Sequence, residues 1–313
     1  MSTTAIPPAE VSVCICTFRR PAQLQGLLRA LMAQSAIGQV LEVIVVDNDP
    51  GQSARPVLAR WRSQGRVPVV ALGCPEPNIS HARNTAIHAA RGPWLAFIDD
   101  DEMPEPDWLE QLLRTARHCR ADAVFAPVVP VYGAQIAPWI VRGRFFERRR
   151  LASGAAVGRG DVRSGNVLIR RALLLGVPGP FDPRFGRTGG EDTLLFTRLL
   201  QDGGVRFVWC DEAVVHEPVE PARAALPWLL RRAYRGGQSF VLVAMRTTPR
   251  GARGRLLACL LARALVQLGV AGILTLLSWP FGRAAWVKWL RLACAQCGKM
   301  TGAMGFHYQE YKR

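Results

Sequence analysis

The sequence predicts an α/β fold in which helices flank a mostly parallel sheet, followed by a basic and apolar helical extension. Short apolar runs alternate with segments of helical spacing through the first 100 residues, which is typical of βαβ units. Acidic residues follow two of the apolar runs, at Asp47 and at Asp99. Residues 223–313 hold 12 Arg, 3 Lys and one Glu, and so carry +14 of the net charge of +16.

The first elements follow one another in regular alternation. We expect strands at residues 11–16, 41–46, 67–72 and 94–98, a helix from Pro21 and a helix over residues 81–90. Ser80 is the expected N-cap of the second helix. Arg83 then lies in the first turn of that helix, where a cation opposes the helix dipole. We therefore expect Arg83 to meet an anion, with a simply exposed side chain as the alternative.

Four consecutive acids, residues 99–102, follow the strand at 94–98. Crowded carboxylates raise one another's pKa unless water, basic side chains or a divalent cation balances their charge. A solvated loop that opens the next helix is the simpler alternative, since Asp107 and Glu110 form a capping-box pattern. That cap lies beyond the cluster, so we predict a metal or nucleotide site where the strand ends.

The turn after the first strand, residues 17–20, contains no glycine. A dinucleotide-binding dehydrogenase needs glycines there to let the backbone approach a pyrophosphate, so this class is disfavoured. Phe18 and the arginines Arg19 and Arg20 instead offer a stacking surface and charge directed at phosphate. Asp47 ends the neighbouring strand, and adjacent parallel strands bring such ends together.

Prolines and glycines interrupt residues 121–186, which we expect to shape a substrate pocket. Short strands are expected at residues 123–125, 166–169 and 205–209, and the arginine-rich run at 142–150 is expected to be a solvated loop. Two glycines precede Glu191 and Asp192 at the start of a helical segment, where the dipole alone also favours acids. His216 ends a further apolar run, and is either a metal ligand or a histidine with an ordinary hydrogen bond.

Residues 264–281 form an uncharged stretch of 18 residues that is barely long enough to span a bilayer. Basic residues flank it on both sides, which favours an interfacial or re-entrant hairpin on the cytoplasmic side. A buried helical pair or a dimer interface is the alternative. The apolar and basic composition suits an anionic membrane surface better than nucleic acid. The first residues lack the pattern of a secretory signal, and Cys294 and Cys297 lack a second ligand pair, so we expect a reducing cytoplasm.

Together, these motifs resemble those of the family 2 glycosyltransferases of the GT-A fold, within the bacterial exopolysaccharide and cell-surface glycan branch. The resemblance covers about residues 9–240 and rests on an ordered set: Thr17-Phe-Arg-Arg, Asp47, Ala82-Arg-Asn84, Asp99-Asp-Asp101, Glu191-Asp192 and His216. It implies a GT-A catalytic domain over residues 1–240, and the composition of residues 241–313 predicts a helical membrane-associating segment. The sequence departs from the family pattern at Arg19, where many members have Asn. It also lacks the Gln-x-x-Arg-Trp motif of processive members. Residues 231–237 are the nearest substitute for that motif. Its absence favours addition of a single sugar.

The resemblance also implies a role for each site residue. The implied nucleotide-sugar ligands are Thr17, Phe18, Arg20, Asp47, Arg83, Asp99 and Asp100. Asp99, Asp101 and His216 would bind Mg²⁺ or Mn²⁺ at the diphosphate. Asp192 would be the general base, and Glu191 would support it.

The implied activity is an inverting, metal-dependent transfer of one sugar from a nucleotide-diphosphate sugar, expected to be a UDP-sugar. The expected acceptor is the hydroxyl of a glycan linked to a polyprenyl diphosphate. The protein would work at the cytoplasmic face of the inner membrane, as a peripheral or monotopic protein, without nucleic acid. Two alternatives stay open: a noncatalytic sugar-nucleotide-binding scaffold at the membrane, and a metal-dependent nucleotidyltransferase.

Overall fold

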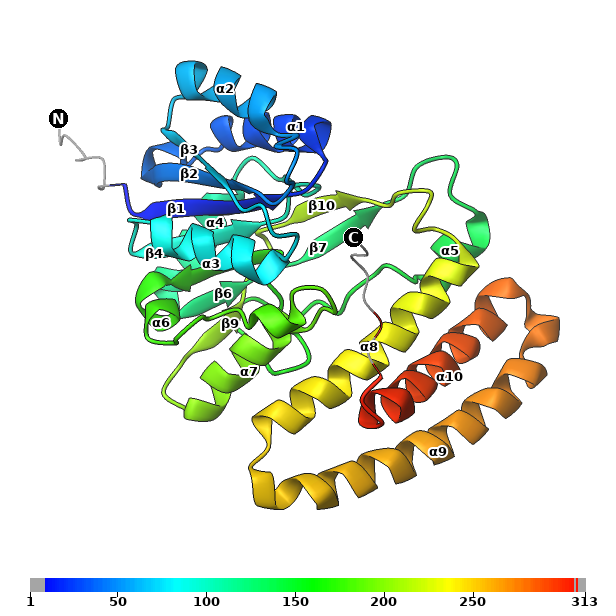
Figure 1. Cartoon of the computed structure of the whole chain (residues 1–313). Helices are drawn as coiled ribbons and strands as arrows, with labels where there is room; N and C mark the ends of the chain where they lie inside the picture. The colour runs from blue at the N-terminus through cyan, green and yellow to red at the C-terminus, as the bar shows by residue number, and fades with distance from the viewer. Residues whose placement is uncertain (1–8, 307, 309–313) are drawn as a thin grey trace. The chain divides into compact units, whose positions relative to one another are not determined.

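The computed structural model describes residues 9–306 and 308 and divides into two compact units (Figure 1). The unit that we call the sheet unit comprises Met1–Val129, Arg148–Gly186 and Leu195–Glu217. The other, the helical unit, comprises Pro130–Glu147, Arg187–Leu194 and Pro218–Arg313.

A seven-stranded sheet runs through the sheet unit in the order β3-β2-β1-β4-β8-β6-β9. Its strands are β1 (Val11–Thr17), β2 (Val40–Asp47), β3 (Val69–Gly73), β4 (Trp94–Ile98), β6 (Ala123–Phe125), β8 (Asn166–Arg170) and β9 (Phe207–Trp209). The pairs among β1 to β4 are parallel, as is β6 with β9, whereas β8 is antiparallel to both β4 and β6. The predicted α/β class with a mostly parallel sheet is confirmed.

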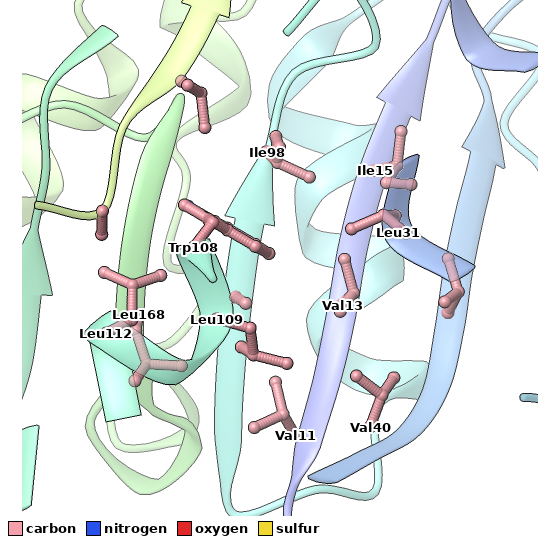
Figure 2. Close-up of a cluster of buried hydrophobic side chains, with 14 of the residues drawn as sticks. Val11, Val13, Ile15, Leu31, Val40, Ile98, Trp108, Leu109, Leu112 and Leu168 are labelled. Atoms are coloured by element: carbon pink, nitrogen blue, oxygen red, sulfur yellow. The ribbon is translucent and has the colours of Figure 1, made fainter. Parts of the chain in front are cut away.

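Helices supply the apolar residues that cover this sheet. They are α1 (Pro21–Met32), α2 (Arg55–Gln64), α3 (Ile79–Ala89), α4 (Trp108–His118), α6 (Arg171–Leu175) and α7 (Glu191–Asp202). Successive side chains of a strand point to opposite faces, so Val13 and Ile15 of β1 join one buried cluster and Cys14 joins the other. Figure 2 shows the first cluster, in which leucines of α1 and α4 and Trp108 lie against the strands.

One predicted helix cap is wrong, and a second is correct in position only. The N-cap of α3 is Asn78, whose side-chain oxygen accepts from the backbone N–H of Ser80 at 3.0 Å and of His81 at 3.4 Å. The Ser80 hydroxyl is buried and donates instead to the carbonyl of Asp182 at 3.0 Å. Asp107 is the N-cap residue of α4, as the pattern predicts, but its side chain makes no cap bond and instead accepts from the Gln111 amide at 2.7 Å.

A second, three-stranded sheet has the order β5-β10-β7. Its strands are β5 (Met103–Pro104), β7 (Val128–Val131) and β10 (Val215–Pro218). β10 is antiparallel to β5, with His216 opposite Met103. This register brings His216 to the segment that directly follows the four consecutive acids.

The arginine-rich run is largely the solvated loop that was predicted, since Arg142, Arg144, Arg149 and Arg150 are exposed, but it also forms ion pairs with distant carboxylates. Its first residues belong to α5 (Pro138–Gly143). Arg148 pairs with Glu217 at 2.9 Å, and Arg150 pairs with Asp211 at 2.8 Å. These carboxylates are more than 60 positions away in the sequence, so local sequence could not reveal the pairing.

The helical unit contains α5, α8 (Leu226–Thr247), α9 (Arg253–Leu277) and α10 (Arg283–Ala303). α10 packs against α5, α8 and α9. Short 3₁₀ turns flank α9, at Arg250–Ala252 (η3) and Trp279–Phe281 (η4). The domain boundary expected at residue 240 falls inside α8.

Glycines let α8 and α10 approach closely. A Cβ atom added at Gly237 would overlap the carbonyl oxygen of Ala295, and one added at Gly298 would overlap that of Tyr234. The Tyr234 hydroxyl also lies 2.7 Å from the Thr301 hydroxyl, which links the same two helices.

Gly237→Ala is expected to destabilise the helical unit by about 1–3 kcal/mol, because the backbone of α10 must move to admit the methyl group. The adjacent Gly236→Ala is the control, since a Cβ there meets nothing within 4 Å. It is expected to be neutral or slightly stabilising, because alanine favours helix more than glycine. Thermal unfolding of the purified full-length protein compares the two. Equal midpoints for both variants would contradict the close packing.

Candidate functional site

The carboxyl ends of three parallel strands meet at one edge of the main sheet. β1 lies between β2 and β4, and Thr17 is in register with Asp47. The turn at residues 17–20, Asp47 and the acids at residues 99–102 therefore lie together. This edge is the place at which open α/β sheets bind their ligands.

Arg20 balances two of the four acids. Its Nη1 donates to Asp100 Oδ1 at 3.0 Å and to Asp101 Oδ2 at 2.7 Å. The hydroxyl of Thr17 donates to the other oxygen of Asp100 at 2.7 Å. Two of the three nucleotide ligands predicted in the turn, Thr17 and Arg20, thus contact the acidic cluster.

Burial and neighbouring charge both act on the pKa values of the acidic cluster. Burial raises the pKa of Asp100 to about 6, although the Arg20 charge and the Thr17 hydrogen bond lower it. Burial, followed by the charge of Asp99, raises the pKa of Glu102 well above its usual value. A cluster with raised carboxyl pKa values is stabilised by any additional positive charge that reaches it.

Arg83 of α3 forms a longer ion pair with Asp99, which follows β4. Their closest nitrogen and oxygen lie 3.6 Å apart, and the Arg83 guanidinium lies over the Phe181 ring at 5.3 Å. Arg83 is buried, whereas the side chain of Asp99 is 45% exposed. Arg83 does meet an anion, as its position in the first turn of α3 predicts, and Asp99 remains accessible to a ligand.

Asp47 and the turn residues are held by local contacts. The two oxygens of Asp47 accept from the backbone N–H groups of Asp49 at 3.0 Å and Ala54 at 2.8 Å. Arg19 has a left-handed φ of 57°, and its guanidinium lies 5.0 Å from the centre of the Phe18 ring. Such strained backbone is concentrated at functional sites. Arg19 Nε also donates to Asp49 Oδ1 at 3.1 Å, so Arg19 contacts both Asp49 and Phe18, the residue expected to stack on a base.

Three asparagines position α3 and were not predicted as site residues. Asn48 donates to the carbonyls of Cys74 at 2.8 Å and Glu76 at 2.6 Å, and accepts from the backbone N–H of Asn78 at 2.8 Å. Asn84 donates to the carbonyl of Phe181 at 2.8 Å and accepts from its N–H at 3.0 Å. These bonds join segments up to 97 positions apart, and together they fix the helix that carries Arg83.

His216 contacts Glu105, with 2.7 Å between Nε2 and Oε1. Over residues 9–306 and 308, no group of three His, Cys, Asp or Glu side chains is arranged to hold a metal ion. The carboxylates of Asp99 and Asp101 are hard oxygen donors of the kind that Mg²⁺ and Mn²⁺ prefer. To bind a metal ion, Asp101 would have to give up its hydrogen bond from Arg20, and His216 would have to give up its contact with Glu105.

Glu191 and Asp192 are the first residues of α7, as the helical spacing predicts, and both belong to the helical unit. Asp192 Oδ1 accepts from the backbone N–H of Thr193 at 2.6 Å. Two glycines with left-handed φ, Gly189 at 81° and Gly190 at 98°, turn the chain just before them. The preceding carbonyl of Thr188 accepts from the hydroxyl of Ser239 on α8 at 3.4 Å.

Comparison with known proteins identifies the family of this chain. A model of the family described as glycosyl transferase family 2 matches residues 12–174, more than half of the chain. The succinoglycan biosynthesis protein ExoM of Rhizobium meliloti is 39% identical over 74% of this chain and 74% of its own length. A glucosyl-dolichyl phosphate glucuronosyltransferase of Haloferax volcanii is 28% identical, over 74% and 76% respectively.

A solved structure supports the fold. It is the mannosyltransferase PcManGT from Pyrobaculum calidifontis in complex with GDP-Man and Mn²⁺, which aligns with a TM-score of 0.64 and 19% identity. The alignment covers 95% of this chain and 86% of that one. The expected GT-A fold is confirmed, and the chain belongs to glycosyl transferase family 2.

Proposed function

We propose that this glycosyltransferase moves one sugar from a nucleotide-diphosphate sugar, with a UDP-sugar as the first candidate, to a hydroxyl of a lipid-linked glycan. The observation that carries the proposal is the meeting of Thr17, Arg20 and the acids at residues 99–101 at one sheet edge. The name of ExoM supports exopolysaccharide synthesis as the setting. The name of the second relative supports an acceptor carried on a lipid phosphate.

The donor would bind along the sheet edge. Phe18 would stack on the base. Asp47 would accept a hydrogen bond from the base, because each of its carboxylate oxygens has two lone pairs and uses one for a backbone N–H. Arg83 would bind ribose or phosphate, while the accessible Asp99 would bind ribose. Asp100 is already bonded to Thr17 and Arg20 and would hold Arg20 toward the phosphates.

Asp99, Asp101 and His216 would hold Mg²⁺ or Mn²⁺, which when bound supplies positive charge to the departing nucleoside diphosphate. The presence of Mn²⁺ in the structure of the mannosyltransferase PcManGT with GDP-Man supports a role for a divalent metal. Until the donor arrives, Arg20 balances Asp100 and Asp101 and so keeps the cluster from repelling a diphosphate. Release of Asp101 would leave Arg20 available to the phosphates.

Asp192 would act as the general base. It would take the proton of the acceptor hydroxyl as that oxygen bonds to the anomeric carbon, while the bond from that carbon to the diphosphate oxygen breaks. Attack on the face opposite the leaving group inverts the anomeric configuration. Glu191 would support Asp192 or contact the acceptor, and the bond from Thr193 fixes the orientation of the Asp192 carboxylate.

The helical unit supplies a surface suited to a membrane. The segment Arg250–Leu277 is long and apolar enough to cross a bilayer, with a mean hydropathy of 2.0 in its most apolar window, of which 11% is buried. Leu276 is 77% exposed and Phe281, in η4, is 81% exposed. Basic residues on both flanks favour a peripheral or monotopic position at the cytoplasmic face of the inner membrane over a single span.

The activity is tested by a screen of nucleotide sugars with the full-length protein, a membrane extract as acceptor source, and Mn²⁺ present or chelated. We expect release of a nucleoside diphosphate that requires both Mn²⁺ and the extract. A noncatalytic scaffold would bind a donor without releasing any product. A nucleotidyltransferase would release pyrophosphate instead.

Asp101→Ala and His216→Ala are each expected to weaken Mn²⁺-dependent UDP binding by about tenfold or more, because each removes a proposed metal ligand. Glu105→Gln is the matched control, since it removes the partner of His216 but leaves the imidazole in place. Its UDP affinity should equal or exceed that of the wild type. Isothermal titration with and without EDTA makes the comparison, and full wild-type affinity in EDTA would rule the metal out.

A further inference from the structure

Helices α8 and α10 lie side by side in the helical unit (Figure 1), and a groove of about 400 Å³ is lined by residues of both. Three cations of α10, namely Lys288, Arg291 and Lys299, line it, and Phe240 of α8 and Leu292 of α10 form its apolar part. Volumes of this size are typical of small-molecule sites.

The spacing of the three cations puts them on one side of α10. Lys288 and Lys299 are eleven positions apart, which is about three turns of a helix, and Arg291 follows Lys288 by three positions, on a neighbouring row of the same side. The ammonium of Lys299 lies 5.0 Å from the centre of the Phe240 ring, and the Arg291 guanidinium lies 5.0 Å from that of Phe145. Phe240 thus holds Lys299 at the groove.

The three helices around the groove contribute no acid that could neutralise this charge. No Asp or Glu occurs between Glu220 and Glu310, so α8, α9 and α10 contain no acid at all. The Nε of Arg291 is buried and has no hydrogen-bond partner within the part of the chain that the structure describes. Burial lowers the pKa of Lys299, and the charge of Arg263 lowers it further. Arg291 and Lys299 are partly buried and Lys288 is exposed, so an anion in this groove would meet positive charge that no acid of these helices balances.

The residues that line the groove, cations beside apolar side chains, suit an anion attached to a hydrocarbon. Phosphate oxygens are strong acceptors for ammonium and guanidinium groups. Phe240 and Leu292 would contact the adjoining chain, and the apolar helix α9 packs against the same α10. Basic pockets between helices at a membrane bind phosphorylated headgroups in this way.

We infer that the groove between α8 and α10 binds the diphosphate of the lipid that carries the glycan acceptor, with Lys288, Arg291 and Lys299 contacting the phosphates. This inference rests on the proposed function, because it assigns a site to the lipid part of the acceptor. It also relates the site to Asp192, since Ser239, next to Phe240 on α8, bonds to the segment that leads into Asp192.

The test measures binding of farnesyl diphosphate to the full-length protein in detergent, without nucleotide. Wild-type protein should bind farnesyl diphosphate more tightly than inorganic diphosphate or farnesol, because both ends contribute. Lys299→Gln and Lys288→Gln should each weaken binding by about tenfold, the loss expected for one charged hydrogen bond. Arg246→Gln, which removes the same charge from an exposed position of α8 outside the groove, should change it by less than about twofold.

Three results would overturn the inference. The double variant of Lys288 and Lys299 could bind as the wild type does, or inorganic diphosphate could bind as tightly as the prenyl compound. Phosphatidylglycerol vesicles could also compete as well as farnesyl diphosphate, which would assign the groove to bulk phospholipid. Failure of the proposed function is distinguishable, because it would abolish release of nucleoside diphosphate by the wild type and leave farnesyl diphosphate binding unchanged.

Discussion

Asp192→Asn is expected to lower sugar transfer by about 10²- to 10⁴-fold while UDP affinity stays within about twofold of the wild type. The substitution keeps the size and polarity of the side chain but removes its basicity. The acceptor hydroxyl would then have to lose its proton to water as it attacks. Single-turnover transfer at saturating donor, together with UDP titration, separates the chemical step from binding.

Asp202→Asn is the matched control, because Asp202 is an exposed acid at the other end of the same helix. It should retain the wild-type rate. Near wild-type turnover by Asp192→Asn would remove Asp192 from the role of base, and a loss of UDP binding would show that the side chain supports the donor site instead.

Replacing Leu276, Trp279 and Phe281 together by Ser is expected to lower the partition of the protein into anionic vesicles by at least about 100-fold. All three side chains are exposed, and burial of a large apolar side chain is worth about 1.5–3 kcal/mol. Sedimentation with vesicles at low and high salt measures the effect. The wild type should remain bound at high salt, because insertion of apolar side chains is not screened as attraction between charges is.

Leu175→Ser is the control for this experiment, since it removes an exposed leucine from α6 of the sheet unit. Its partition should match that of the wild type, and an unchanged partition of the triple variant would contradict the membrane proposal. These substitutions are a sharper test than truncation at residue 250. Truncation would also remove α10, which packs against α5 and α8 and is part of the helical unit.

The strands of the sheet were predictable because a strand buried on both faces is a nearly continuous apolar run. β1, β2 and β4 lie within a residue or two of their predicted bounds, and acids follow the last two as expected. Since β1 pairs with both of its neighbours in parallel, the meeting of Asp47 and Asp99 at one edge followed from the same pattern. Fold class and site location thus depend on features that extend over several residues.

The partners of individual side chains were not predictable in the same way. The pairing of Arg20 with Asp101 joins positions 81 apart, and that of His216 with Glu105 joins positions 111 apart. Several partners of suitable charge exist for each group in the sequence, and only the packed fold selects one. Asn78 replaced Ser80 as a cap for a related reason, because the Ser80 hydroxyl is taken by a distant carbonyl.

The central claim, sugar transfer from a nucleotide sugar to a lipid-linked acceptor, is tested most directly by following the sugar. Full-length protein in detergent is given UDP-sugars labelled in the sugar, Mn²⁺ and a lipid extract from membranes, and the label in the organic phase is compared with the UDP released. We predict label in the lipid fraction in equal amount to UDP, with almost none for Asp192→Asn. Donor binding without label in any lipid fraction, or release of pyrophosphate in place of UDP, would contradict it.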